Sequence, residues 1–241
     1  MRADVFLVER GYAKSRSEAQ AAIRLGRVRA DGLVLTKPSQ AVTANAAIEY
    51  ERPHPFVSRG GVKLKAALEH FALSPEACVC LDLGASTGGF TQVLLEGGAT
   101  RVHAVDVGRG QMDESLARDP RVIRHEGLNA RELSAVHVPE PVGAITADLS
   151  FISLELALPP ALSLAARDGW LVALVKPQFE VGRAAIGKGG LVRDTHAREA
   201  ALTGIANFVA ARSGWTVLGH IESPIAGGDG NIEYLLAARR T

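Results

Sequence analysis

Residues 79 to 96, with the sequence VCLDLGASTGGFTQVLLE, predict a strand, a tight turn and a helix in immediate succession. Val79 to Leu83 has the alternating apolar side chains of a short buried strand, and Phe90 to Glu96 has helical periodicity that ends at a pair of glycines. Three glycines between them allow the backbone to turn sharply and to approach a ligand. The stretch therefore predicts a βα unit with a nucleotide-sized pocket at its turn.

An acidic residue stands near the end of the next apolar run, Arg101 to Val107. It is Asp106, and a carboxylate at the end of a second parallel strand can accept hydrogen bonds from both hydroxyls of a ribose. A dinucleotide site has the pattern GxGxxG, whereas this turn has Ser86 at the second glycine. S-adenosylmethionine, which has a cationic sulfonium and no phosphate, fits this turn and the acidic Asp82 better. A structural turn without a ligand stays open from this stretch alone.

Composition describes an ordinary globular chain with an uneven charge distribution. Its 241 residues are 47% hydrophobic and 22% charged, with a net charge of +1. Residues 1 to 63 contain 11 lysines and arginines against 6 acids, whereas the remainder contains 16 against 20. A basic front and an acidic back indicate two domains with different partners.

The two cysteines, Cys78 and Cys80, are two apart on a predicted strand, a spacing that does not suit a disulfide. We expect core thiols in a reducing cytoplasm. No signal peptide is visible, and the most apolar long stretch, Leu156 to Ala166, is too short to span a bilayer. No cluster of ligating residues predicts a metal site.

Residues 1 to 57 form a predicted small α+β module and linker. The pattern gives a short helix up to Gly11, then a second helix that begins with the capping box Ser15 to Glu18 and uses Ala19, Ala22, Ile23 and Leu25 as its apolar face. Asp31-Gly32 predicts a two-residue hairpin, and Ile48 to Tyr50 predicts one more strand. Glu51 to Val57, which contains two prolines, reads as a semi-rigid linker.

The stretch SRSEAQAAIRLGRVRADGLVLTKPSQAV, residues 15 to 42, resembles the S4 domain, an RNA-binding fold. The chain has Ala44-Asn45 where that family usually has Gly-Asp, a difference that affects a turn more than the binding face. Basic residues near the second helix would bind RNA phosphates. They are Lys14, Arg16, Arg24, Arg27 and Arg29. A merely solvated charged face is the alternative, which the S4 pattern disfavours.

Residues 58 to 241 form the second predicted domain, with an α/β, mostly parallel, Rossmann-like sheet. Strands are expected at Val122-Ile123, Ala144 to Ala147, Trp170 to Val175, Thr216 to Ile221 and Ile232 to Ala238. Helices are expected at Leu154 to Ala166 and at His196 to Arg212, the latter with Ala200, Ile205, Phe208 and Val209 as apolar contacts. Glu180 to Asp194 is long and rich in glycine, as a functional lid would be.

Polar residues that end apolar strands are the candidates for chemistry, because ligands bind at the carboxyl ends of strands in such sheets. Asp148 and Lys176 each end a strand, and Glu233 shares their edge if the last strand is antiparallel. Each one alone is more typical of a surface charge. Lys63 lies off the apolar stripe of its helix and, from local pattern, reads as a surface lysine.

The motifs SRGGVKL, LDLGASTGGFTQVLLEGGA, ADLSFISL, LVKPQFEVG and GNIEYLL resemble the TlyA family, ribosomal-RNA 2′-O-methyltransferases related to FtsJ and often named hemolysins. The resemblance covers nearly the whole chain and implies a catalytic Lys-Asp-Lys-Glu tetrad, which falls on Lys63, Asp148, Lys176 and Glu233. It also implies a cytidine of large-subunit RNA as substrate. Family members that also modify small-subunit RNA tend to be longer at both ends, so that second substrate stays open.

The turn and the resemblance together predict which residues bind S-adenosyl-L-methionine and the ribosomal RNA or subunit. The cofactor residues are Asp82, Gly84, Ser86, Thr87, Gly88, Gly89, Asp106, Asn129 and Asp148. Arg59 joins the predicted RNA-binding residues.

Lys176 is the candidate base, since a ribose hydroxyl is a weak nucleophile until its proton is removed. Burial and a second cation, Lys63, would favour its neutral amine, whereas Asp148 and Glu233 would favour the ammonium, so the sequence leaves its protonation state open. Two other function classes remain at this stage. A non-catalytic RNA-binding or ribosome-assembly factor would need the S4 module only, and a hemolysin would need membrane-seeking segments that the sequence does not show.

Overall fold

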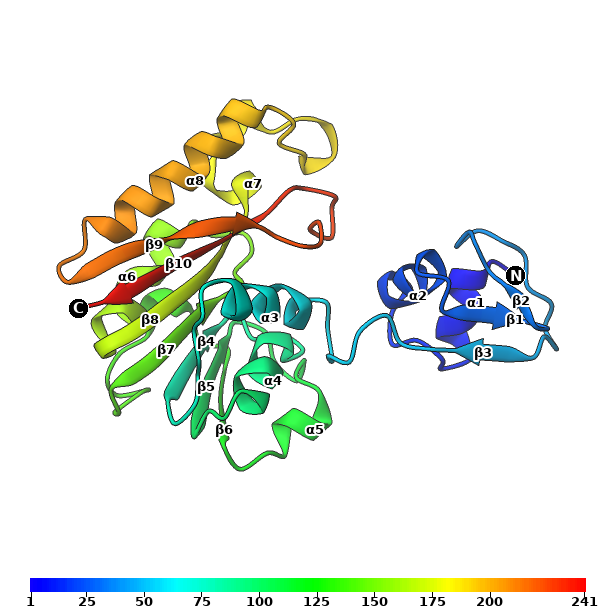
Figure 1. Ribbon diagram of the computed structural model, residues 1–241, viewed down its shortest axis with the longest axis horizontal. Coiled ribbons are helices and arrows are strands. Elements are labelled where there is room, and N and C mark those ends of the chain that lie inside the picture. Colours follow the sequence, from blue (N-terminus) through cyan, green and yellow to red (C-terminus); the bar gives the residue numbers. More distant parts are fainter. The chain divides into compact units, whose positions relative to one another are not determined.

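The computed structural model describes residues 1–241, which divide into two compact units, Met1–Pro55 and Phe56–Thr241 (Figure 1). Each unit has its own hydrophobic core. No helix in either unit is long and apolar enough to cross a lipid bilayer.

The N-terminal unit packs two helices against a small antiparallel sheet in the order β2-β1-β3. Its elements are α1 (Ala3–Glu9), α2 (Arg16–Arg24), β1 (Val28–Ala30), β2 (Leu33–Val34) and β3 (Ile48–Tyr50). Asp31 and Gly32 both have positive φ, 50° and 76°, as a two-residue hairpin turn requires. The predicted hairpin is therefore confirmed.

Two details of the second helix differ from the sequence prediction. Ser15 Oγ accepts a hydrogen bond from the Glu18 backbone N–H, but the Glu18 carboxylate accepts from the Lys14 N–H instead of the Ser15 N–H, so the capping box closes one residue earlier. Leu25 was expected in the apolar face and is 59% exposed, because the helix ends at Arg24 and its next residue turns outward.

The linker is shorter than predicted. Glu51 still belongs to the first unit, since its backbone N–H donates to the Arg27 carbonyl beside β1. Phe56 and Val57 pack against the core of the second unit. The prolines Pro53 and Pro55 lie between these two anchored ends.

The second unit is built on a seven-stranded sheet in the order β6-β5-β4-β7-β8-β10-β9. Its strands are β4 (Val79–Leu83), β5 (Arg101–Asp106), β6 (Val122–Glu126), β7 (Val142–Ala147), β8 (Ala165–Val175), β9 (Trp215–Glu222) and β10 (Tyr234–Arg240). β10 is antiparallel to both of its neighbours, whereas the strands from β6 to β8 are parallel. The predicted Rossmann-like α/β class is confirmed.

Helices cover both faces of this sheet (Figure 1). α3 (Gly60–His70), α4 (Gly89–Glu96) and α5 (Glu114–Ala117) lie on one face, and α6 (Leu154–Ser163) and α8 (Thr195–Ala210) lie on the other. Short helices complete the connections: η1 (Ala130–Glu132), α7 (Pro177–Glu180), η2 (Arg183–Ala185) and η3 (Lys188–Gly190).

Two expectations for the helices need correction. The helix that begins at Leu154 ends at Ser163 and not at Ala166, because Ala165 already pairs with β7 as part of β8. Ala200, expected as an apolar contact of α8, is exposed, while Ala201 and Leu202 supply the buried contacts.

The strand order reverses beside β4, which pairs with β5 on one side and with β7 on the other. β5 and β7 then lead to loops that diverge to opposite sides, which opens a crevice at the carboxyl ends of the parallel strands. The turn after β4 lies at this crevice, so the topology places a binding site next to it.

Candidate active site

The turn after β4 is shaped by backbone that only small residues can adopt. Gly84 has φ +81°, and a Cβ there would collide with the main-chain oxygen of Asp148. Gly88 has φ +94° and caps α4, where a Cβ would collide with the Leu116 side chain. Since no side chain fits at either position, the turn leaves a bare backbone cradle at the crevice.

Asp106, at the end of β5, stabilises this turn through two hydrogen bonds. Its Oδ2 accepts a hydrogen bond from the Ser86 N–H at 2.8 Å, and its Oδ1 accepts from the Gly108 N–H at 2.7 Å. A carboxylate oxygen can accept more than one hydrogen bond, so both oxygens keep capacity for a ligand. Asp106 also lines the adjoining cavity, as predicted for the residue that binds a ribose.

Asp82 does not face that cavity. It is fully buried in β4, where its oxygens accept from the hydroxyls of Thr91 on α4, at 2.7 Å, and Thr146 on β7, at 3.0 Å. Burial raises the pKa of this carboxyl to about 6, against the opposing effect of the threonine hydrogen bonds. Its position ties β4 to α4 and β7 and does not support the prediction of a direct cofactor contact.

A cavity of about 1130 Å³ extends from the turn across the loops that follow β5, β7 and β8. Among the residues that line it are Gly84, Ser86, Asp106, Asn129 and Asp148, all of them predicted cofactor residues. Its volume suits a ligand larger than most drug-sized molecules.

Two aromatic residues at this cavity were missed by sequence reasoning. Phe151 is 92% exposed, has φ +65°, and lies with its ring centroid 5.1 Å from that of Phe179. A bulky residue with positive φ is rare, and an exposed phenylalanine in that conformation gains nothing from the core. Phe151 occurs in the quoted motif ADLSFISL, but nothing in the local pattern indicates that its ring is exposed to solvent instead of buried in the core.

Lys63 and Glu233 form a buried ion pair. Lys63 lies in the first turn of α3, and Glu233 immediately precedes β10, yet Lys63 Nζ is 2.5 Å from Glu233 Oε2. The side chains are only 9% and 3% exposed. The reading of Lys63 as a surface lysine is therefore wrong, because the reversed direction of β10 brings Glu233 to the edge where α3 begins.

Lys176 and Asp148 form a second pair beside the first. Lys176 Nζ lies 2.6 Å from Asp148 Oδ1 and donates a hydrogen bond to Ser150 Oγ at 2.9 Å. A smaller cavity of about 230 Å³ is lined by both Lys63 and Asp148, together with Arg59 and the glycine turn. Each ion pair therefore has one residue in the lining of the smaller cavity, Lys63 in one pair and Asp148 in the other. Asp148 also lines the large cavity.

In the N-terminal unit, most of the predicted RNA-binding arginines already have acidic partners. Arg16 pairs with Asp4 at 2.9 Å, Arg27 with Glu51 at 3.3 Å and Arg29 with Glu49 at 3.8 Å. All three side chains remain at least 38% exposed, so they can still face a phosphate. Arg24 is exposed, and none of the ion pairs of this unit includes it.

Asp4 explains why Arg16 has a structural role as well. Its carboxylate is fully buried and accepts from Arg2, Arg16 and the Gln20 amide, at 2.8 to 3.2 Å. These partners, led by the Arg2 hydrogen bond, hold the pKa of the Asp4 carboxyl well below its usual range. Arg16 therefore shares the buried Asp4 carboxylate with Arg2 and Gln20, in addition to carrying surface charge.

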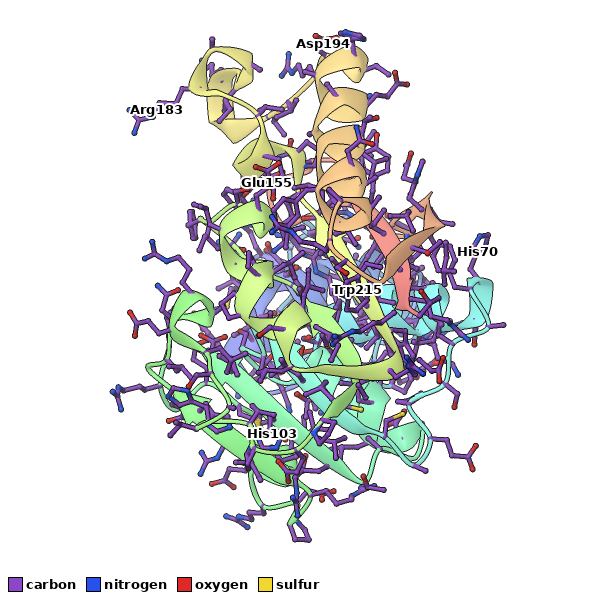
Figure 2. The ribbon with its side chains drawn as sticks, turned by 90° about the vertical axis from the view of Figure 1, so that its left-hand side faces the viewer. His70, His103, Glu155, Arg183, Asp194 and Trp215 are labelled. Carbon is purple, nitrogen blue, oxygen red and sulfur yellow. The ribbon has the colours of Figure 1, made fainter.

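Two further arginines line the large cavity and were not among the sequence candidates. They are Arg131 in η1, two residues after Asn129, and Arg183, the first residue of η2. Arg183 is exposed and projects outward from its loop (Figure 2). Arg59 lines the smaller cavity, so each cavity has at least one arginine in its lining.

Comparison with known proteins identifies the family. The FtsJ-like methyltransferase family matches residues 56–240, and the S4 domain matches residues 1–48. The 16S/23S rRNA (cytidine-2′-O)-methyltransferase TlyA of Mycobacterium tuberculosis is 46% identical over 240 residues, which are 99% of this chain and 89% of that protein. This chain belongs to the TlyA family.

Solved structures match this chain in whole or in part. A Streptococcus thermophilus protein assigned as a hemolysin is 39% identical, with a TM-score of 0.78, and the match covers all of this chain and 88% of that one. An O-methyltransferase from Bacillus cereus in complex with SAH is 17% identical, with a TM-score of 0.53, over 76% of this chain and 82% of that one, and shows the methyltransferase fold alone. The predicted TlyA resemblance is confirmed.

Proposed function

We propose that this chain transfers a methyl group from S-adenosyl-L-methionine to a ribose 2′-hydroxyl of ribosomal RNA. The observation that carries the proposal is the meeting of Lys63, Asp148, Lys176 and Glu233 as two ion pairs beside the glycine turn. Buried charges are costly, and three of these four residues are at most 9% exposed. Two such pairs, which reach the smaller cavity through Lys63 and Asp148, indicate chemistry rather than stability.

The residues at the turn fit the proposed methyl donor. The bare backbone at Gly84 gives room for an amino-acid tail, and Asp106 retains hydrogen-bonding capacity for ribose hydroxyls. Asn129 and Ser86 line the same cavity. S-adenosylmethionine supplies a methyl group on a sulfonium, and its transfer forms an O–C bond while the electrons of the broken C–S bond return to sulfur.

Lys176 acts as the base in this proposal. Lys176 must first give up a proton of its ion pair to solvent; its amine then accepts the proton of the 2′-hydroxyl as the ribose oxygen becomes the nucleophile, and the ammonium that forms again is stabilised by Asp148 at 2.6 Å. It then returns the proton to solvent. Lys63 is held by Glu233 as a fixed cation near the reacting oxygen, where a developing negative charge is stabilised.

The exposed surfaces favour RNA as the molecule that carries this ribose. Phe151 and Phe179 offer aromatic faces on which a base can stack, and base stacking on aromatic side chains is common in RNA recognition. Arg59, Arg131 and Arg183 can neutralise phosphates around the cavity, and the S4 unit supplies further cations. We infer a cytoplasmic enzyme that acts on ribosomal RNA or a ribosomal subunit, with a cytidine of 23S RNA as the first substrate to test.

Labelled methyl transfer to unmodified 23S and 16S ribosomal RNA tests the proposal. We expect incorporation into 23S RNA by the wild-type protein, and a loss of about 10²- to 10⁴-fold in the single-turnover rate for Lys176→Ala. Lys176→Arg should not restore activity, since a guanidinium cannot accept the proton. Incorporation into 16S RNA would add the second substrate of the Mycobacterium relative.

The same assay separates the other function classes. A folded wild-type protein that binds RNA but methylates neither RNA would be a binding or assembly factor. Full activity of Lys176→Ala would refute its role as base, and activity of Lys176→Arg would reduce that role to a positive charge. Lysis of erythrocytes by the purified protein, without RNA methylation, would favour the hemolysin interpretation.

A further inference from the structure

Ser150 belongs to none of the predicted sets of site residues, although it touches the proposed base. It lies in the loop after β7, two residues beyond Asp148, and lines the large cavity. Its Oγ accepts a hydrogen bond from Lys176 Nζ at 2.9 Å, and no other hydrogen bond of its side chain occurs in the structure. One loop therefore presents two acceptors to one amine.

The two acceptors can determine the orientation of the amine when it is neutral. A neutral lysine has two N–H donors and a single lone pair, and only the lone pair can accept a proton. The amine also rotates freely about its Cε–Nζ bond unless its donors are held. Asp148 Oδ1 at 2.6 Å and Ser150 Oγ at 2.9 Å provide partners for both donors. The lone pair must then take the remaining direction.

The backbone restricts the other end of the same side chain. Lys176 follows β8 directly, is followed by Pro177 at the start of α7, and is only 9% exposed. With its stem buried and both N–H groups held by the loop after β7, the amine has little freedom left. The two residues that hold the amine, Asp148 and Ser150, both line the large cavity.

We propose that Ser150 is a positioning residue, which fixes the rotation of the Lys176 amine so that its lone pair faces the ribose hydroxyl. This inference rests on the proposed function. A carboxylate alone would hold one N–H and leave the amine free to swivel about that contact. Ser150 removes this remaining rotation and acts on the reaction through Lys176.

Single-turnover methylation of ribosomal RNA, with saturating RNA and cofactor, tests the proposal. Ser150→Ala should lower the rate by about 10- to 100-fold, the usual range for losing one hydrogen bond to a charged or reacting group. Cofactor affinity by calorimetry, RNA affinity and the melting temperature should stay unchanged. Ser150→Thr keeps the hydroxyl and should recover most of the rate, and Ser213→Ala, an exposed serine after α8, is the matched control.

A double-mutant cycle distinguishes positioning from an independent effect. In a Lys176→Ala background, Ser150→Ala should cause no further loss, because there is no amine left to orient. An equal loss in both backgrounds, a wild-type rate in Ser150→Ala, or a failure of Ser150→Thr to recover the rate would each overturn the inference while leaving the proposed function intact. A wild-type protein that methylates no RNA would overturn both together.

Discussion

The buried pair of Lys63 and Glu233 makes a strong prediction about stability. Replacing Lys63 by methionine keeps the apolar stem but leaves the Glu233 carboxylate, 3% exposed, without its cation. Breaking a buried ion pair by removing one partner costs about 3 to 5 kcal/mol. Because a domain of ordinary stability unfolds at about 5 to 15 kcal/mol, this one substitution should remove a large part of the stability of the second unit.

The same helix provides the control. Lys65 is two residues further along α3 and pairs with Glu69 at 3.3 Å, but both side chains are more than half exposed. Lys65→Met should therefore cost no more than about 0.5 kcal/mol, the usual value of an exposed pair on one helix. Replacing both Lys63 and Glu233 by methionine should cost less than Lys63→Met alone, because no charge is then left buried without a partner.

Urea unfolding followed by tryptophan fluorescence measures these differences. Trp170 and Trp215 are the two tryptophans of the chain, and both are buried in the second unit, so the signal reports on the unit that contains the pair. The midpoint of Lys63→Met should fall well below that of Lys65→Met with a similar slope. Equal midpoints for these two variants, or a double variant as unstable as the single one, would refute the reasoning.

Three further predictions concern the cofactor, the RNA and the pH dependence of folding. Asp106→Ala should weaken S-adenosylmethionine binding, at about 1.5 to 3 kcal/mol for each charge-assisted hydrogen bond lost, and calorimetry showing wild-type affinity would remove it from the ribose site. Arg24→Glu should weaken RNA binding and reduce its salt slope while cofactor binding is retained; an unchanged salt titration would make that arginine a solvated surface charge. Burial, chiefly, lowers the pKa of His103 to about 4, so the unfolded chain binds more protons between pH 6.5 and 4 and stability falls as the pH drops through this window. His103 alone should contribute a loss of about 2 kcal/mol at pH 5, whereas Asp82, with its raised pKa, acts in the opposite direction in both proteins. The difference between urea midpoints at pH 7 and pH 5 should therefore change in His103→Gln, and a pH dependence that is the same in both proteins would contradict this prediction.

The sheet was predictable from sequence because burial leaves a clear pattern in each strand. β4 and the Trp170 to Val175 part of β8 are nearly continuous apolar runs, as central strands covered on both faces must be, and the glycines after β4 mark the turn directly. Element ends were less predictable. Helical periodicity in the sequence continues to Ala166, but Ala165 begins a strand in the structure, because pairing with β7 overrides the local preference for a helix.

The site was predictable only in part, because its contacts are long-range. Lys63 and Glu233 are 170 positions apart, and no local pattern distinguishes a lysine that meets a distant carboxylate from one that meets water. Family resemblance supplied that pair. Asp82 shows the opposite case, since its place beside a glycine turn suggested a ligand contact, whereas its carboxylate is fully buried between Thr91 and Thr146.

The antiparallel strand β10 has a consequence for the order in which the protein can assemble. β10 lies between β8 and β9, although it follows both of them in the chain. As the polypeptide is synthesised, β8 and β9 must wait with unpaired edges until residues 234 to 240 have emerged and inserted between them. Glu233 arrives with that insertion, so Lys63 gains its partner only when the sheet closes. An incompletely synthesised chain would therefore hold the glycine turn without a complete tetrad.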